Sequence, residues 1–340
     1  MWPATPFFIF NELLYIYPEP NSNPMNKLLR YLLMTLAAVV VLVACGAAFI
    51  QIKGVPYYDT VKIDYVHKST PANIERGKKL ASMLCANCHM NANTGRLSGK
   101  RMSDAPPEFG ITYSANITKD QQHGIAGYTD GELLYLLRTG VKKNGQYAPP
   151  YMAKLPHMSD DDINAIIAFL RSDDPMVQAD ATPTKPCEPS FLTKFLCNTA
   201  FKPLPMPEKP IVMPDSSDKV AFGKYMAINL DCWTCHSGDF TKMDVMVPEN
   251  SYHFFGGGNK PLNLEGDPIL TSNLTPDNET GIGLWSEEKF VKALKYGIVD
   301  GQSALRYPMV PYTQLTDYEA AAIYAYLRTV PPIKNKIERK

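Results

Sequence analysis

The apolar and charged positions divide the chain into one uncharged stretch and a long remainder in which apolar residues recur at helical spacing. Residues 31–50 carry no charge, and a helix of that length rises about 30 Å, enough to cross the hydrocarbon core of a bilayer. Lys27 and Arg30 precede the stretch. The positive-inside bias therefore predicts a transmembrane anchor at 31–50, a cytoplasmic tail at 1–30, and export of the residues that follow.

The start of the chain allows two further interpretations. Met25 is an alternative start, in which case residues 1–24 are not translated. Leu42-Val43-Ala44-Cys45 resembles a bacterial lipobox, which would place a lipid on Cys45 and remove the residues before it. Because the sequence stays apolar after Cys45, we favour the anchor and keep the lipoprotein as the alternative. In both cases the remaining chain faces an oxidising compartment, most simply the bacterial periplasm, from a place at the inner membrane.

Two stretches of the exported part match each other without a gap at an offset of 157 residues, and shorter matches lie upstream. The matching pairs include Gly77 and Gly223, Cys85 and Cys232, Asn116 and Asn273, Gly140 and Gly297, Met152 and Met309, Ser159 and Thr316, and Arg171 and Arg328. The sequence therefore predicts two copies of one unit, at 70–171 and 219–335.

Each copy carries the start and stop signals of helices. These are N-cap residues at Thr70, Thr129 and Ser159 in the first copy and at Ser286 and Thr316 in the second, with Gly140 and Gly297 as C-terminal stops. The connections between the helices are long and irregular, which is unusual in a compact domain. A large bound cofactor at the centre of each unit would explain them.

The segment between the copies, 172–218, holds nine prolines and cannot be helical throughout. We expect it to run extended, as a Pro-rich linker over the surface of one or both units. Cys187 and Cys197 lie within it, and in an exported protein they are candidates for a disulfide, with two free thiols as the alternative. The predicted fold is all-α: a transmembrane helix, then two tandem domains joined by this linker.

Each copy contains one Cys-x-x-Cys-His motif. The two motifs are Cys85-Ala-Asn-Cys88-His89 and Cys232-Trp-Thr-Cys235-His236. This is the attachment pattern of c-type haem: two thiols on one helical turn reach both vinyl groups of a porphyrin edge, and the following histidine reaches the iron. The other imidazole nitrogen should donate to a backbone carbonyl, which fixes the ring. The wide spacing of the motifs argues against a zinc ribbon, and the missing βαβ pattern argues against a thioredoxin-like dithiol. We predict two covalently bound haem c groups.

Met152 and Met309 are the candidates for the second axial ligand of each iron. They occupy the same position in the two copies, in loops flanked by prolines that hold a side chain at little entropic cost. The alternative is that both fill gaps in the core. Met158 is a local rival, but it aligns with Leu315 and is expected in the core. His123, His157 and His253 lack matching histidines in the other copy.

The balance of charge narrows the class of partner. Thirty-four basic residues face 34 acidic ones, for a net charge of zero. A nucleic-acid-binding protein needs a basic surface, so we expect no nucleic-acid partner.

The motifs together resemble a known family. The run from Asn273 to Ser286, the Pro308-Met-x-Pro-Tyr312 segment and the closing Ala-Ile-Tyr-Ala-Tyr-Leu-Arg are similar to the multihaem cytochrome c subunits of bacterial membrane-bound alcohol, aldehyde and gluconate dehydrogenases. The resemblance covers roughly residues 70–335 and is more specific in the second copy. It implies tandem class I cytochrome c folds, His–Met iron and periplasmic electron transfer. Those subunits commonly carry three haem domains, whereas this chain has two.

The resemblance also marks residues of the haem pockets, each with an ordinary structural alternative. It implies propionate hydrogen bonds, or else turn capping, for Asn116, Thr118, Asn273 and Thr275, and packing on a haem edge, or else in the core, for Tyr128 and Trp285.

The expected function is therefore a membrane-anchored dihaem cytochrome c that carries single electrons and has no catalytic residues. Its partners would be redox proteins: a dehydrogenase, a quinol-oxidising complex, an oxidase or another cytochrome. The rival is a dihaem enzyme, of peroxidase or thiosulfate dehydrogenase type, in which one iron has a displaceable ligand. A third interpretation is a docking subunit that holds a dehydrogenase or oxidase at the membrane.

Overall fold

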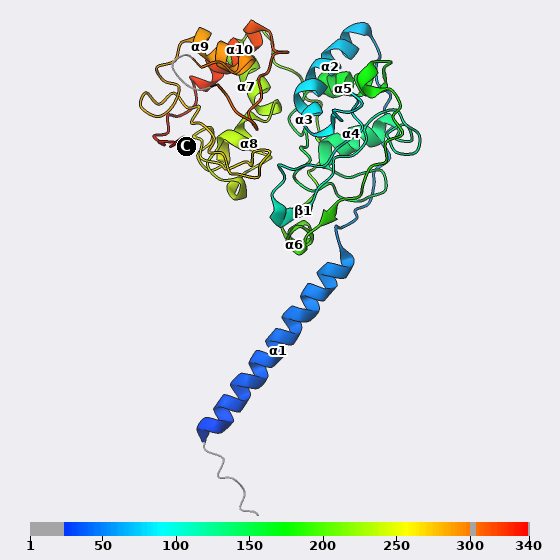
Figure 1. Ribbon diagram of the computed structural model, residues 1–340, viewed down its shortest axis with the longest axis vertical. Coiled ribbons are helices and arrows are strands. Elements are labelled where there is room, and N and C mark those ends of the chain that lie inside the picture. The colour runs from blue at the N-terminus through cyan, green and yellow to red at the C-terminus, as the bar shows by residue number, and fades with distance from the viewer. Residues whose placement is uncertain (1–23, 300–303, 339–340) are drawn as a thin grey trace, which may run out of the picture. The chain divides into compact units, whose positions relative to one another are not determined.

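The computed structural model describes residues 24–299 and 304–338 and separates into two compact units, residues 1–52 and 53–340. Helices dominate it (Figure 1), as the sequence predicts. In chain order the α-helices are α1 Pro24–Lys53, α2 Pro71–Leu84, α3 Ala86–His89, α4 Asp130–Thr139, α5 Asp160–Arg171, α6 Phe191–Thr199, α7 Lys219–Asn229, α8 Cys232–His236, α9 Glu287–Tyr296 and α10 Asp317–Leu327. Short 3₁₀ turns lie at η1 Pro107–Phe109, η2 Pro175–Val177, η3 Phe240–Lys242 and η4 Pro248–Asn250. Within the described residues the strands are β1, Gly110–Ile111, and β2, Glu188–Pro189, which pair antiparallel.

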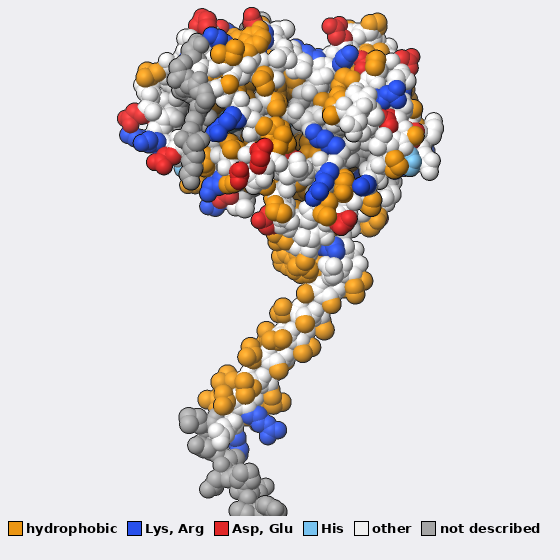
Figure 2. Space-filling model, in the orientation of Figure 1, with side chains coloured by type: hydrophobic (Ala, Val, Ile, Leu, Met, Phe, Trp, Pro, Cys, Tyr) orange, Lys and Arg blue, Asp and Glu red, His pale blue; other side chains and the backbone are white. Residues whose placement is uncertain are grey.

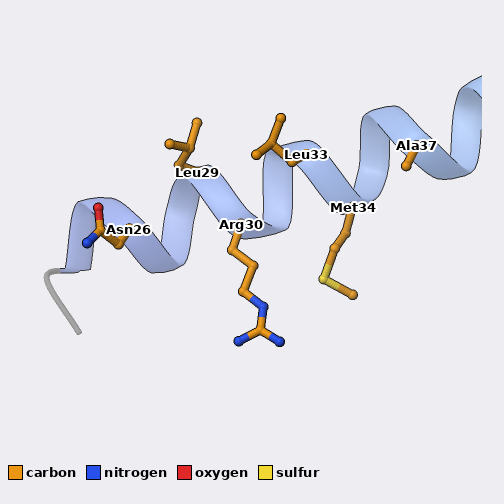
Figure 3. Close-up of a pocket in the computed structure, with 6 residues that line it drawn as sticks. All are labelled: Asn26, Leu29, Arg30, Leu33, Met34 and Ala37. Carbon is orange, nitrogen blue, oxygen red and sulfur yellow. The ribbon is translucent and has the colours of Figure 1, made fainter. Parts of the chain in front are cut away.

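The first unit is essentially the helix α1. Its segment Asn26–Lys53 contains an 18-residue stretch with a mean hydropathy of 2.7 and is long and apolar enough to cross a membrane, a property that a signal sequence shares. Arg30 projects from the first turns on the same side as Met34, whereas Leu29 and Leu33 point to the other side (Figure 3), which places a cation at the start of the apolar helix. The helix is longer than the predicted 31–50, and residues 1–23 of the predicted tail lie outside the described residues.

The helix boundaries in the second unit follow the capping signals. Thr129 and Thr316 form complete capping boxes with Glu132 and Glu319. Thr70, Ser159 and Ser286 each accept a hydrogen bond from the backbone at the third helical position. Gly140 and Gly297 end α4 and α9 in the left-handed conformation that glycine adopts without strain. The predicted starts and stops are confirmed.

Each repeat is built on one close helix crossing. Helix α2 packs on α5, and α7 packs on α10. A Cβ atom on Gly77 would lie 1.8 Å from the Ala165 carbonyl oxygen, and one on Gly223 would lie 1.8 Å from the Ala322 oxygen. The two crossings are therefore equivalent, and each brings backbone against backbone. The apolar face of α5 predicted from the sequence is fully buried there, with Ile163, Ile166 and Ile167 at 0% exposure.

The two repeats also contact each other, through equivalent residues. Lys79 in α2 forms an ion pair with Glu319 in α10. Lys79 lies two residues after Gly77, and the equivalent residue after Gly223 is Tyr225 in α7. The Tyr225 hydroxyl donates a hydrogen bond to Asp162 in α5 at 2.7 Å. Arg76 joins the two sides, because it binds Asp162 through two nitrogens at 2.8 and 2.9 Å and Glu319 at 3.3 Å. The helices that form the crossings thus also form the contact between the repeats.

Removing the Tyr225 hydroxyl is expected to weaken this contact. The hydroxyl also accepts a hydrogen bond from the Ser159 backbone at 3.0 Å, in a site where Tyr225 is 7% exposed. Tyr225→Phe should lower the free energy of unfolding by about 1–3 kcal/mol, because it leaves a buried N–H without its partner. Denaturant titration of the detergent-solubilised protein measures the change. Tyr318→Phe is the control, because the hydroxyl that it removes donates to the carbonyl of exposed Ser216, which water can reach, and equal losses in both variants would contradict the assignment.

The segment 172–218 holds more regular structure than the sequence predicts. It contains η2, β2 and the helix α6. It runs along the first repeat and is joined to it by backbone hydrogen bonds of 2.8–3.0 Å. The carbonyls of Met176, Val177 and Ile211 in the segment accept from the first repeat, and the carbonyl of Thr139 in the first repeat accepts from the segment. The helix was not expected in a segment with nine prolines.

Cys187 and Cys197 are separate free thiols, so the structure departs from the expected disulfide. The Cys187 sulfur hydrogen-bonds the backbone N–H and carbonyl of Tyr113 at 3.3 and 3.2 Å. Cys197 is fully buried in the last turns of α6. Both sulfurs lie near Tyr151, where burial raises the pKa of the hydroxyl and each sulfur contributes to the rise.

Candidate haem-binding sites

Both Cys-x-x-Cys-His motifs lie on single helical turns. Cys85 ends α2 and precedes α3, and the backbone N–H of His89 donates to the Cys85 carbonyl at 2.8 Å. In the second repeat the whole motif, Cys232 to His236, forms α8. One turn places the two sulfurs and the ring of each motif near one another, as the sequence analysis requires.

Both histidine rings are fixed by a backbone carbonyl. His89 Nδ1 lies 2.7 Å from the Ala115 oxygen, and His236 Nδ1 lies 2.8 Å from the Ser272 oxygen. Since a carbonyl only accepts, Nδ1 carries the proton and donates, and Nε2 is the nitrogen that can ligate iron. This confirms the hydrogen bond expected from the sequence. Burial lowers the pKa of His89, which favours the neutral ring that a metal ligand needs.

Ala115 and Ser272 were not singled out from the sequence, because their contribution comes from the backbone. They are equivalent at the offset of 157 residues, each directly before the Asn-x-Thr of its repeat. That position, one residue ahead of a repeated motif, is the signal that could have identified them.

The motif thiols lie in surroundings that disfavour charge. Burial raises the pKa of Cys85, Cys232 and Cys235 to about 12 and also raises that of Cys88. A thioether to a porphyrin is uncharged and fits such a site, whereas a zinc centre needs thiolates. Among residues 24–299 and 304–338 no group of three or more His, Cys, Asp or Glu side chains is placed to hold a metal ion.

The loops that carry Met152 and Met309 are held in the same way. In the first repeat the backbone N–H groups of residues 148, 152 and 155 donate to the carbonyls of 140, 149 and 137 at 2.7, 3.0 and 2.8 Å. In the second, residues 305, 309 and 312 donate to 297, 306 and 294 at 2.9, 3.0 and 2.9 Å. All three pairs are related by the repeat. Both methionines are partly buried, and Met309 packs against the apolar core.

The rivals of these methionines have other roles. Met158 is fully buried, and its counterpart Leu315 is 2% exposed, as expected for core residues. His157 Nε2 lies 2.7 Å from the Val245 carbonyl of the second repeat. His253 stacks on Tyr252 with ring centroids 4.0 Å apart.

The Asn-x-Thr residues hold backbone in place. Asn116 Nδ2 donates to the carbonyls of Asp180 and Thr182 at 2.7 and 3.2 Å, and its Oδ1 accepts from the N–H and hydroxyl of Thr118 at 2.9 and 2.7 Å. In the second repeat Asn273 Nδ2 donates to the carbonyl of Ile333 at 2.7 Å and to the hydroxyl of Thr280 at 3.1 Å, and its Oδ1 accepts from the N–H and hydroxyl of Thr275 at 2.9 and 2.7 Å. Each Asn-x-Thr motif thus holds, by hydrogen bonds to backbone carbonyls, the chain segment that follows the last helix of its own repeat. These bonds engage the donors of all four side chains and favour turn capping over propionate binding.

Tyr128 and Trp285 are half-buried and pack against the apolar core. A lysine lies over each ring: Lys143 Nζ is 4.9 Å from the Tyr128 centroid, and Lys289 Nζ is 4.7 Å from the Trp285 centroid. The two lysines come from different positions of the repeat, since Lys289 aligns with Glu132, so only the aromatic rings themselves are equivalent. Their packing on a haem edge stays a prediction.

The residues of each site fit a covalently held haem. Two neutral thiols and a histidine lie on one turn, the histidine ring is fixed through Nδ1, and a methionine loop of equivalent construction lies in the same repeat. When bound, haem supplies a centre that gains or loses one electron.

Comparison with known proteins gives the same picture. The family model for cytochrome c matches residues 74–173 and 220–331, together more than half of the chain. The chain is 29% identical over 277 residues to the alcohol dehydrogenase (quinone) cytochrome c subunit of Gluconobacter oxydans, covering 77% of this chain and 55% of that protein. It is 28% identical over 275 residues to the gluconate 2-dehydrogenase cytochrome c subunit of Pantoea cypripedii, covering 77% and 60%.

A third relative has a more similar length. The chain is 27% identical over 265 residues to a diheme cytochrome c-type protein of Cereibacter sphaeroides, covering 74% of this chain and 83% of that protein. By contrast, the chain spans only 55% and 60% of the two dehydrogenase subunits.

Proposed function

The chain belongs to the cytochrome c family, and from that membership we propose that it carries single electrons through two haem c groups, each with one histidine and one methionine on its iron. The proposal depends most on the repeat: two Cys-x-x-Cys-His turns with carbonyl-fixed histidines are accompanied by two methionine loops with the same three hydrogen bonds. An iron with both axial positions filled binds no substrate, so its chemistry is electron transfer. The length of the diheme relative supports two haems.

Contacts between the repeats support electron transfer from one haem to the other. Tyr307, two residues before Met309, donates its hydroxyl to Asp104 of the first repeat. Asp104 lies close enough to Cys88 to contribute to the raised pKa of that thiol. The loop with the proposed ligand of the second haem thus contacts the surroundings of the first haem.

We place the protein at the bacterial inner membrane with its cytochrome domains, 70–171 and 219–335, in the periplasm. The helix α1 supports the anchor, because it contains the uncharged stretch 31–50 and carries Lys27 and Arg30 just before it. The lipoprotein at Cys45 remains the alternative. The relatives are cytochrome subunits of dehydrogenases, so a dehydrogenase is the favoured electron donor, and a quinol-oxidising complex, an oxidase or another cytochrome are the other redox partners.

Removing one haem attachment tests the proposal directly. The mature protein should carry two haem masses on the polypeptide and titrate as two one-electron centres. Cys232→Ala/Cys235→Ala should reduce both counts to one, because that motif supplies both thioether bonds of the second haem. Mass spectrometry and visible redox titration measure this.

The matched control is Cys197→Ala, which removes a buried cysteine outside both motifs and should leave two haems. A wild-type mass without porphyrin, or a double variant that retains two covalent haems, would overturn the assignment.

A further inference from the structure

Helix α6, in the segment between the repeats, has an exposed face that is more apolar than its buried face. Phe191, Leu192 and Phe195 are 46%, 42% and 40% exposed, whereas Thr193 and Cys197 on the other side are buried. A surface helix in water has the opposite arrangement, with its apolar stripe turned to the core. Phe191 and Phe195 stack on each other with ring centroids 6.2 Å apart.

The orientation of α6 is fixed by hydrogen bonds from its inner face. The Thr193 hydroxyl donates to the Phe109 carbonyl at 2.8 Å, and the Ser190 hydroxyl donates to the Glu108 carbonyl at 2.5 Å. Ser190 also caps the helix, accepting from the N–H of Thr193 at 3.2 Å. The helix cannot turn its phenylalanines inward without losing these bonds.

The last turns of α6 lie at the point where the chain leaves α1. Asn198 Nδ2 donates to the Gly54 carbonyl at 2.8 Å, and Gly54 directly follows Lys53, the last residue of α1. If α1 crosses the membrane, Gly54 is at the level of the lipid headgroups. A helix hydrogen-bonded to Gly54 is then at that level too.

We propose that α6 is an interfacial membrane helix, with Phe191, Leu192 and Phe195 inserted at the boundary between headgroups and acyl chains of the bilayer. The proposal rests on the proposed membrane anchoring of the chain just before Gly54, through α1 or through a lipid on Cys45. It explains the inverted pattern, because lipid rather than water would cover the apolar face. In Figure 2 hydrophobic side chains gather at the end of the second unit where Figure 1 labels α6.

The strand next to α6 carries a further exposed apolar side chain. Strand β1 pairs with β2, two residues before α6, and its Ile111 is 37% exposed. A lipid on Cys45 would also leave only nine residues to Gly54, so the proposal holds for either mode of anchoring. The consequence is that the first repeat is held against the membrane at two points, α6 and the chain after α1, rather than by a single flexible connection.

Photocrosslinking to lipid tests the proposal on the full chain. p-Benzoylphenylalanine replaces Phe195, Leu36 of α1, or Tyr318 of α10, whose 46% exposure matches that of Phe191. The proteins are reconstituted in liposomes of phosphatidylethanolamine and phosphatidylglycerol, irradiated, and analysed by mass for lipid adducts. We expect adducts at positions 36 and 195, at least about tenfold above position 318.

The outcomes separate the two claims. Adducts at 36 but not at 195 would overturn the interfacial helix while leaving the anchor intact. No adduct at 36 would count against the membrane span itself. A protein adduct at 195 in place of lipid would also overturn the proposal. In F191S/L192S/F195S, which changes only exposed side chains, adducts from a probe at Ile111 should fall at least about fivefold while the haem content stays unchanged.

Discussion

Met309→His lowers the reduction potential of one haem by a large part of the ~0.8 V range that axial ligands control, and leaves the other haem near its original value. A thioether stabilises ferrous iron relative to an imidazole, so methionine raises the potential and a second histidine lowers it. The loop around Met309 is held by backbone hydrogen bonds from residues 305, 309 and 312, none of which involves the replaced side chain. A spectroelectrochemical titration of the anchored protein resolves the two centres.

The control is another methionine of the same chain. Met158 is fully buried and has a leucine, Leu315, as its counterpart in the second repeat. Met158→Leu should leave both potentials unchanged and cost less than about 1.5 kcal/mol, because the swap conserves volume. If both potentials are unchanged in Met309→His, Met309 is not a ligand of the iron. A shift in Met158→Leu would instead transfer the ligand role of the first haem to Met158.

The local part of this structure could be predicted from the sequence. Caps at Thr129 and Thr316, stops at Gly140 and Gly297, and the two Cys-x-x-Cys-His turns depend on residues within a few positions of one another. The repeat strengthens each of these predictions, because a signal that recurs at the same offset in both copies does not arise by chance. Even the Nδ1 hydrogen bond of each histidine followed from the chemistry of metal ligation.

Helix α6 differs from the extended linker expected from the sequence, because that expectation rests on the proline content of the whole segment 172–218. Its nine prolines lie at 175–189 and 203–214, so 190–202 is free of proline and begins with Ser190, an N-cap residue. That local signal was present in the sequence. The orientation of the helix was not, since a pattern of apolar residues does not say whether protein, water or lipid covers it.

The contact between the repeats could not be predicted for a different reason. Arg76 and Glu319 are 243 residues apart in sequence, and charged residues on a helix normally face water. No spacing rule links them. Lys79 and Tyr225 occupy equivalent positions two residues after Gly77 and Gly223, but a lysine and a tyrosine share no residue type that would mark them as a common contact. Cys187 and Cys197 are free thiols in the structure, which is the alternative that the sequence left open, and two cysteines ten residues apart do not by their spacing decide between a disulfide and free thiols.

Among glycine-to-alanine substitutions in the second repeat, Gly223→Ala should be the most destabilising. The added Cβ would lie 1.8 Å from the Ala322 oxygen and 2.4 Å from its carbonyl carbon. Both are backbone atoms of α10, so α7 and α10 must move apart, and the core that they share opens. We expect a loss of about 3 kcal/mol or more in the free energy of unfolding, and Gly77→Ala should do the same at Ala165.

Gly127→Ala is the matched control, because the Cβ there meets only the flexible end of Lys143 at 3.1 Å. Its effect should stay within about 0.5 kcal/mol. Denaturant unfolding of the haem-loaded proteins gives the comparison, and haem content per chain covers the case in which Gly223→Ala accumulates poorly. A Gly223→Ala protein as stable as Gly127→Ala would mean that the helices do not cross at this distance. The repeat would then lose the packing on α10 of the helix α7, which leads into the Cys-x-x-Cys-His turn.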